Sequence, residues 1–292
     1  TVSDNSGGYN IAIGDCAGKS ITTGACNIYI GQKAGCAAVT TGNYNIGFGF
    51  NTAKCITSGH RNLFIGYNSG NAAVLTASDN VALGPDNSRS LTSGARNIFI
   101  GNYNNRMDTL GIDNIGIGGN VMGACDGASA NRKYNIAMGC RAMGCLTSGC
   151  YNIAIGYLSG DHIRSKGCNI FLGSESGMNA YGSDNISIGR NAGKGQGSSI
   201  DDNTGVGNIF IGSKTAEGYC SAGCNVFIGG YAGSALTTGG FNTGIGYLGG
   251  RNITTGGKNV AIGYNTCVAS ATGSSQLAIG SDGSYWITGD SS

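Results

Sequence analysis

The chain has 292 residues, of which 56 are glycine and one, Pro85, is proline. A helical fold is disfavoured because each interior glycine costs a helix about 1 kcal/mol relative to alanine, and collagen is excluded because it needs abundant proline and glycine at every third position. Apolar residues make up 40% and charged residues 11%, with a formal net charge of +2. This balance argues against disorder and against nucleic-acid binding. No apolar run approaches the about 18 residues of a membrane-spanning helix, so we expect no membrane insertion.

A five-residue motif, Asn-Ile-x-Ile-Gly, recurs along the whole chain at intervals of 16 to 18 residues, with longer intervals of 21 after Asn114 and 23 after Asn185. A period near 17 is too short for a helical repeat and fits one coil of a β-solenoid. We predict an all-β solenoid or β-roll of about sixteen 17-residue coils, forming a single repeat domain over residues 1–292. The coils start near Asn10, Asn27, Asn45, Asn62, Asn80, Asn97, Asn114, Asn135, Asn152, Asn169, Asn185, Asn208, Asn225, Asn242, Asn259 and Gln276.

Each motif predicts one short strand. The first and third residues after the asparagine are apolar in 31 of 32 cases, the exception being Thr243. Alternation with period two predicts a strand that buries one face, and we expect these two columns to point into the coil. The fourth residue is glycine in all sixteen copies. A position that never accepts a side chain predicts positive φ or a close backbone approach.

The residue between the two apolar columns is small or aromatic, with Ser187 as its only polar member. If the flanking columns point inward, this middle column points outward, where exposed aromatic rings would promote aggregation. We therefore expect it to be buried against other copies in an intertwined or side-by-side homotrimer. The predicted oligomer interface consists of Tyr29, Phe64, Phe99, Phe171, Phe210 and Phe227.

Two further columns predict ladders between coils, because neighbouring strands lie about 4.8 Å apart. The asparagines are expected to form an internal amide ladder at the strand starts. The residues that precede four consecutive asparagines are Arg61, Asp79, Arg96 and Asp113, whose alternating charges predict a surface charge ladder.

Twelve cysteines are spread along the chain without a Cys-x-x-Cys pair, so we expect no zinc site. Several occupy similar offsets in adjacent coils, where a disulfide could span the gap. The candidate pairs are Cys36 with Cys55, Cys125 with Cys145, and Cys150 with Cys168. The alternative is that these cysteines are small buried thiols.

The two over-long coils supply the candidate ligand loops, because extra residues in a solenoid usually leave as loops on one side. The charged and aromatic residues there suit a polar partner such as a cell-surface glycan or receptor. They are Arg132, Lys133, Tyr134, Asp201 and Asp202. The alternative is that both inserts are neutral changes in loop length and bind no partner.

No constellation of residues predicts catalysis. The chain has two histidines, His60 and His162, and two glutamates, Glu175 and Glu217, at scattered positions. The many Gly-x-Gly strings lie inside the repeat and lack the strand–loop–helix context of a phosphate-binding loop. We expect a protein that is not an enzyme and needs no cofactor or metal.

The repeat resembles those of tail-fibre and fibre-like proteins of bacteriophages and large DNA viruses, and more distantly the head repeats of trimeric autotransporter adhesins. The resemblance rests on Asn10-Ile-Ala-Ile-Gly14, Ala17-Gly18 and Thr22-Thr23-Gly24, and on the segment Trp286-Ile287-Thr288-Gly289-Asp290. It implies a homotrimeric attachment fibre or adhesin shaft at an extracellular or virion surface. The alternative is a self-assembling extracellular filament built by end-to-end stacking of solenoid rods, because open solenoid edges can pair with another chain.

Overall fold

The computed structural model describes residues 7–36, 39–72, 75–104, 110–123, 131–196 and 204–290, and contains strands but no helix over these ranges. The chain divides into two compact units, Thr1–Cys150 and Tyr151–Ser292. The strands of the first unit are β1 (Ile11–Ile13), β2 (Ile28–Ile30), β3 (Ile46–Phe48), β4 (Leu63–Ile65), β5 (Val81–Leu83), β6 (Ile98–Ile100), β7 (Ile115–Ile117) and β8 (Ile136–Met138). Those of the second unit are β9 (Ile153–Ile155), β10 (Ile170–Leu172), β11 (Ile186–Ile188), β12 (Ile209–Ile211), β13 (Val226–Ile228), β14 (Thr243–Ile245), β15 (Val260–Ile262), β16 (Leu277–Ser281) and β17 (Ser284–Gly289).

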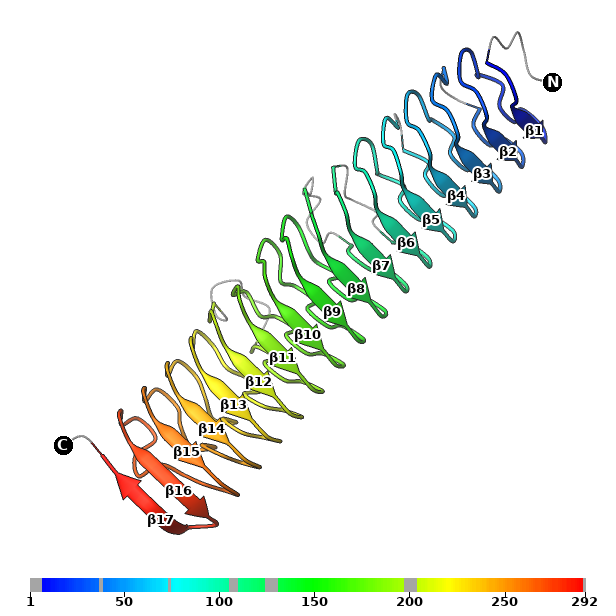
Figure 1. The fold of residues 1–292 in the computed structure, drawn as a ribbon. Helices are drawn as coiled ribbons and strands as arrows, with labels where there is room; N and C mark the ends of the chain where they lie inside the picture. Colours follow the sequence, from blue (N-terminus) through cyan, green and yellow to red (C-terminus); the bar gives the residue numbers. More distant parts are fainter. Residues whose placement is uncertain are drawn as a thin grey trace. The chain divides into compact units, whose positions relative to one another are not determined.

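Both units are β-solenoids in which every coil contributes one strand to a parallel sheet. In the first unit β1 to β8 pair consecutively, and in the second β9 to β16 do the same (Figure 1). Equivalent motif positions are opposite one another in each of these pairs, as in Phe210 with Phe227. The predicted all-β solenoid is confirmed. One strand departs from the repeat, because β17 folds back antiparallel against β16.

The asparagines form the predicted internal ladder. Asn27 Oδ1 accepts hydrogen bonds from the backbone N–H of Asn45 at 2.9 Å and from its side-chain amide at 3.1 Å. The Asn45 amide also donates to the Gly59 carbonyl at 2.8 Å. The backbone link recurs from Asn10 to Asn135 in the first unit and from Asn152 to Gln276 in the second. Each buried amide therefore joins two coils.

The two faces of the strands are the reverse of the sequence prediction. Successive side chains of a strand point to opposite faces, so the residue two after an inward asparagine must also point inward. The middle column lies inside the coil, and the apolar columns on either side of it point outward. The predicted interface residues Tyr29, Phe64, Phe99, Phe171, Phe210 and Phe227 are at most 1% exposed within a single chain. They form its core and cannot contact another copy.

Large and small residues of the middle column interlock inside each unit. A Cβ added to Gly244 would lie 2.4 Å from the Phe227 ring, and one added to Gly116 would lie 2.6 Å from the Phe99 ring. The aromatic ring of one coil thus fills the space that a glycine leaves in the next. Alternating residue sizes in this column reflect core packing within one chain.

The motif glycine meets both conditions expected of it. Fifteen of the sixteen have φ between 119° and 137°, a conformation that residues with side chains rarely adopt. A Cβ added to Gly229 would also lie 2.2 Å from the Gly246 carbonyl oxygen of the next coil. Any other residue would strain the corner and push neighbouring coils apart.

Tyr29 is the one middle-column tyrosine, and its hydroxyl is buried without a hydrogen-bond partner among the described residues. Burial raises the pKa of this phenol above its ordinary value. Replacement by phenylalanine keeps the ring and removes the unpaired oxygen, so Tyr29→Phe is expected to increase the free energy of unfolding by about 1 kcal/mol. Urea unfolding at pH 7 measures this, and a loss of stability would contradict it.

The same substitution is expected to reduce alkaline sensitivity. The unfolded chain releases a tyrosine proton near pH 10, whereas the folded chain holds the Tyr29 proton to higher pH. Stability is therefore complete below about pH 10 and falls as the pH rises further. Tyr29→Phe is expected to lose less stability than the wild type between about pH 9 and 11. An identical loss in both proteins would exclude a contribution from this phenol.

Candidate functional site

The outward columns form a long apolar surface in each unit, here called the isoleucine face: the first and third residues after each motif asparagine. None of its 32 members is buried. Its most exposed members in the first unit are Ile11, Ile13, Ile46, Phe48, Ile65, Ile98, Ile100 and Met138, and in the second Ile155, Ile228 and Ile245, at 36% to 58% exposure. The face carries no charged residue.

Aromatic residues border the isoleucine face on both sides. The leading rim is the residue before each asparagine, and the trailing rim is the residue after each motif glycine. Exposed aromatic residues on the leading rim are Tyr9, Tyr44, Tyr134, Tyr151 and Phe241, and on the trailing rim Phe50, Tyr67, Tyr157, Tyr247 and Tyr264. Neighbouring trailing-rim rings stack, with centroids 5.4 Å apart for Phe50 and Tyr67 and 5.8 Å apart for Tyr247 and Tyr264.

This combination is typical of a protein–protein interface. Aromatic residues are enriched and charges depleted at the centres of interfaces. A standard interface uses about 20 to 30 residues on each side, and in each unit the isoleucine face offers 16 residues and the two rims a further 16. Soluble monomers rarely expose contiguous apolar patches of this extent. The face is the strongest candidate functional surface of the chain.

The predicted charge ladder is confirmed on the leading rim. Arg61 Nε donates to Asp79 Oδ1 at 2.6 Å, and Arg96 Nε donates to Asp113 Oδ1 at 2.7 Å. The hydrogen bond from each arginine holds the pKa of its aspartate below the ordinary value. Because both pairs are open to solvent, we expect them to contribute little to folding stability.

The residues predicted as ligand loops lie elsewhere than expected. Arg132 is fully buried, and its Nη1 donates to the Met122 carbonyl oxygen. From this position it cannot contact a ligand, which corrects the prediction. Lys133 pairs with coil neighbours on either side, and Tyr134 belongs to the leading rim. Asp201 and Asp202 lie outside the described residues, and their role stays a prediction.

Two of the three predicted disulfides are wrong. Cys36, Cys55, Cys150 and Cys168 are all free thiols. In each pair the two cysteines differ by one position in their coils. Cys36 lies nine residues after its motif asparagine, and Cys55 lies ten residues after its own. Cys150 lies two residues before the next motif asparagine, and Cys168 lies one residue before the one that follows it. Cys145 is disulfide-bonded, and its predicted partner Cys125 lies outside the described residues.

This distribution predicts a thiol count. Among the cysteines that the structure describes, ten are free: Cys16, Cys26, Cys36, Cys55, Cys140, Cys150, Cys168, Cys220, Cys224 and Cys267. Titration of the non-reduced, denatured protein with a thiol reagent is expected to find these ten and no more. Twelve free thiols would show that Cys145 is reduced, and eight or fewer free thiols would show that the chain contains further disulfides.

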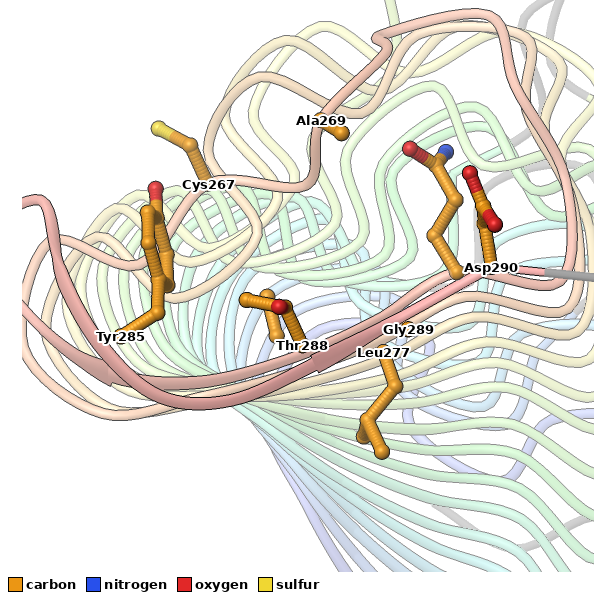
Figure 2. A pocket seen from close by; sticks show the side chains of 9 residues that line it. Cys267, Ala269, Leu277, Tyr285, Thr288, Gly289 and Asp290 are labelled. Atoms are coloured by element: carbon orange, nitrogen blue, oxygen red, sulfur yellow. The ribbon is translucent and has the colours of Figure 1, made fainter.

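One pocket of about 370 Å³ opens where β17 meets β16. Tyr285, Thr288 and Asp290 line it together with Cys267 from the preceding turn, while Leu277 points to the other face of the sheet (Figure 2). The lining has one carboxylate and one thiol but no histidine, lysine or arginine. It therefore lacks the paired acid and base of a hydrolytic site.

Comparisons with known proteins do not assign the chain to a family. No family model, no curated protein and no solved structure matches it. Over the described ranges, no helix is long and apolar enough to cross a membrane. By its fold, the chain is a glycine-rich β-solenoid repeat protein.

Proposed function

We propose that this chain is a non-enzymatic structural fibre that assembles with copies of itself through the isoleucine face, as the shaft of a viral or phage attachment fibre or of a surface adhesin. The observation that carries the proposal is the uncharged apolar surface, which repeats in every coil of both units. In a single chain this surface stays in contact with water. Association would bury it, and each Å² of apolar surface removed from water contributes about 25 cal/mol.

A second copy of the chain is the occupant that the surface fits best. A partner must present an uncharged face whose side chains repeat at the coil spacing of about 4.8 Å. The isoleucine face of another copy meets this requirement over its full length. A homotrimer would place three such faces around one axis and leave the turns, with their polar residues, on the outside.

The proposed location is an extracellular or virion surface. Disulfides persist in oxidising environments, and Cys145 is disulfide-bonded. In this setting the fibre would present its turns to a cell-surface glycan or receptor. Its parallel ladders, in which buried asparagines join successive coils, suit a role that demands rigidity.

A second candidate, a filament of rods stacked end to end, is favoured by β17. This strand covers the open edge of β16, and all six of its residues are exposed. Trp286 is 76% exposed and Ile287 is 53% exposed. Stacking would pair the outer edge of β17 with a strand of another copy, since an exposed edge strand is a template for pairing.

Electron microscopy of the purified full chain separates the two candidates. The fibre proposal expects discrete rods of uniform length, each containing several chains. Indefinite filaments would favour end-to-end stacking. Single-chain particles at micromolar concentration would overturn both.

A further inference from the structure

The two rims of the isoleucine face carry matched residues. Each trailing-rim residue lies six positions after the leading-rim residue of the same coil. All five trailing-rim aromatic residues have an aromatic or cationic residue at this matched position, although only eight of the sixteen leading-rim residues are of these kinds. The matched pairs are Tyr44 with Phe50, Arg61 with Tyr67, Tyr151 with Tyr157, Phe241 with Tyr247, and Lys258 with Tyr264.

Charge follows the same pattern. Arg190 is the one cationic residue of the trailing rim, and its matched leading-rim residue is Asp184. No coil carries like charges at the two positions. Aromatic pairs, cations over aromatic rings and opposite charges are all favourable contacts when the groups meet.

These groups cannot meet within one chain. In the coil of Asp184 and Arg190 the three residues of β11 lie between them, and that strand alone spans about 10 Å. Both side chains are exposed, and over the described ranges neither one takes part in an ion pair. Contact between the matched residues of the two rims therefore needs a second chain.

Only one packing direction brings matched positions together. When copies stand parallel around a common axis, the leading rim of one copy meets the trailing rim of the next at the same coil. In an antiparallel pair, leading rims would meet leading rims in reversed order. We infer that the copies pack parallel and in axial register, with Asp184 of one copy paired to Arg190 of the partner subunit.

This inference rests on the proposed assembly through the isoleucine face, and a cross-linking experiment tests the two separately. Cys168 is a free, exposed thiol on the leading rim, and its matched trailing-rim residue is Ser174. In the full-length Ser174→Cys variant, oxidised glutathione would accept two electrons and two protons as an interchain disulfide forms between positions 168 and 174. Peptide mapping by mass spectrometry identifies the link.

The matched control is Ser213→Cys, which places a thiol on the trailing rim two coils further on. Two coils displace it by about 10 Å, beyond the Cα separation of about 4.4–6.8 Å that a disulfide allows. We expect the link to Cys168 in Ser174→Cys and its absence in Ser213→Cys. A link from Cys168 to position 213, or between Cys168 residues of two copies, would overturn the parallel register while leaving the assembly intact. A monomeric wild type would instead overturn the proposed assembly.

Charge exchange gives an independent readout. Arg190→Asp places two carboxylates at each contact and is expected to raise the dissociation constant of the assembly by about two- to five-fold for each pair. The double variant Asp184→Arg/Arg190→Asp restores opposite charges and is expected to recover the wild-type value. An unchanged constant in the single variant, or no recovery in the double variant, would overturn this pairing.

Discussion

Phe227→Asp is expected to unfold the coils around β13. The ring is fully buried in the core of the second unit, with its centroid 6.3 Å from that of Phe210. Removing a buried phenylalanine side chain costs about 3–5 kcal/mol, and a carboxylate without a buried partner adds to this cost. Circular dichroism and limited proteolysis are expected to show lost strand signal and new cleavage sites near residues 210–245.

A stable, protease-resistant Phe227→Asp protein would contradict the inward orientation of the middle column. A parallel Phe227→Leu variant keeps an apolar side chain of smaller volume. It is expected to fold with a lower melting temperature, which would show that loss of the fold in the aspartate variant comes from the buried charge.

Ile228→Asp combined with Ile245→Asp is expected to separate the copies and preserve the fold. These side chains are 37% and 38% exposed on the isoleucine face, one residue beyond middle-column positions that are fully enclosed. Surface substitutions usually change stability by less than about 0.5 kcal/mol each, whereas two carboxylates in an apolar interface would lose their hydration. Light scattering measures the mass, and circular dichroism confirms the fold.

Thr238→Asp is the matched control for this variant, since it adds a carboxylate to an exposed turn that follows the same strand, away from the isoleucine face. It is expected to retain the mass of the wild-type assembly. If Thr238→Asp dissociated as readily as the isoleucine variant, added charge in general would explain the loss of assembly.

The sequence was sufficient to predict the architecture but misassigned the two faces of its strands. The period near 17 and the invariant glycine determine the coil, because both are constraints of the backbone. The faces were misassigned because two expectations conflict. Asparagines in an internal ladder, such as Asn225, share strand parity with the middle column, so Phe227 must point inward whenever Asn225 does. Combining the two columns would have given the correct orientation from sequence alone.

The smaller features depend on single-residue offsets that a repeat of variable length obscures. Cys36 and Cys55 differ by one position when counted from their own asparagines, and both are free thiols. From the sequence we expected Arg132 to lie in a polar surface loop, but its side chain is fully buried inside the coil. No local sequence signal predicts that burial, because it depends on how the enlarged coil closes against its neighbours.

Multi-angle light scattering of the purified wild-type chain measures directly whether copies assemble. One chain has a mass of 29.3 kDa. We expect a stable whole-number multiple of this mass, three chains for a homotrimer, and the mass of one chain in the Ile228→Asp/Ile245→Asp variant. A folded wild-type protein with the mass of a single chain at micromolar concentration would contradict assembly through the isoleucine face.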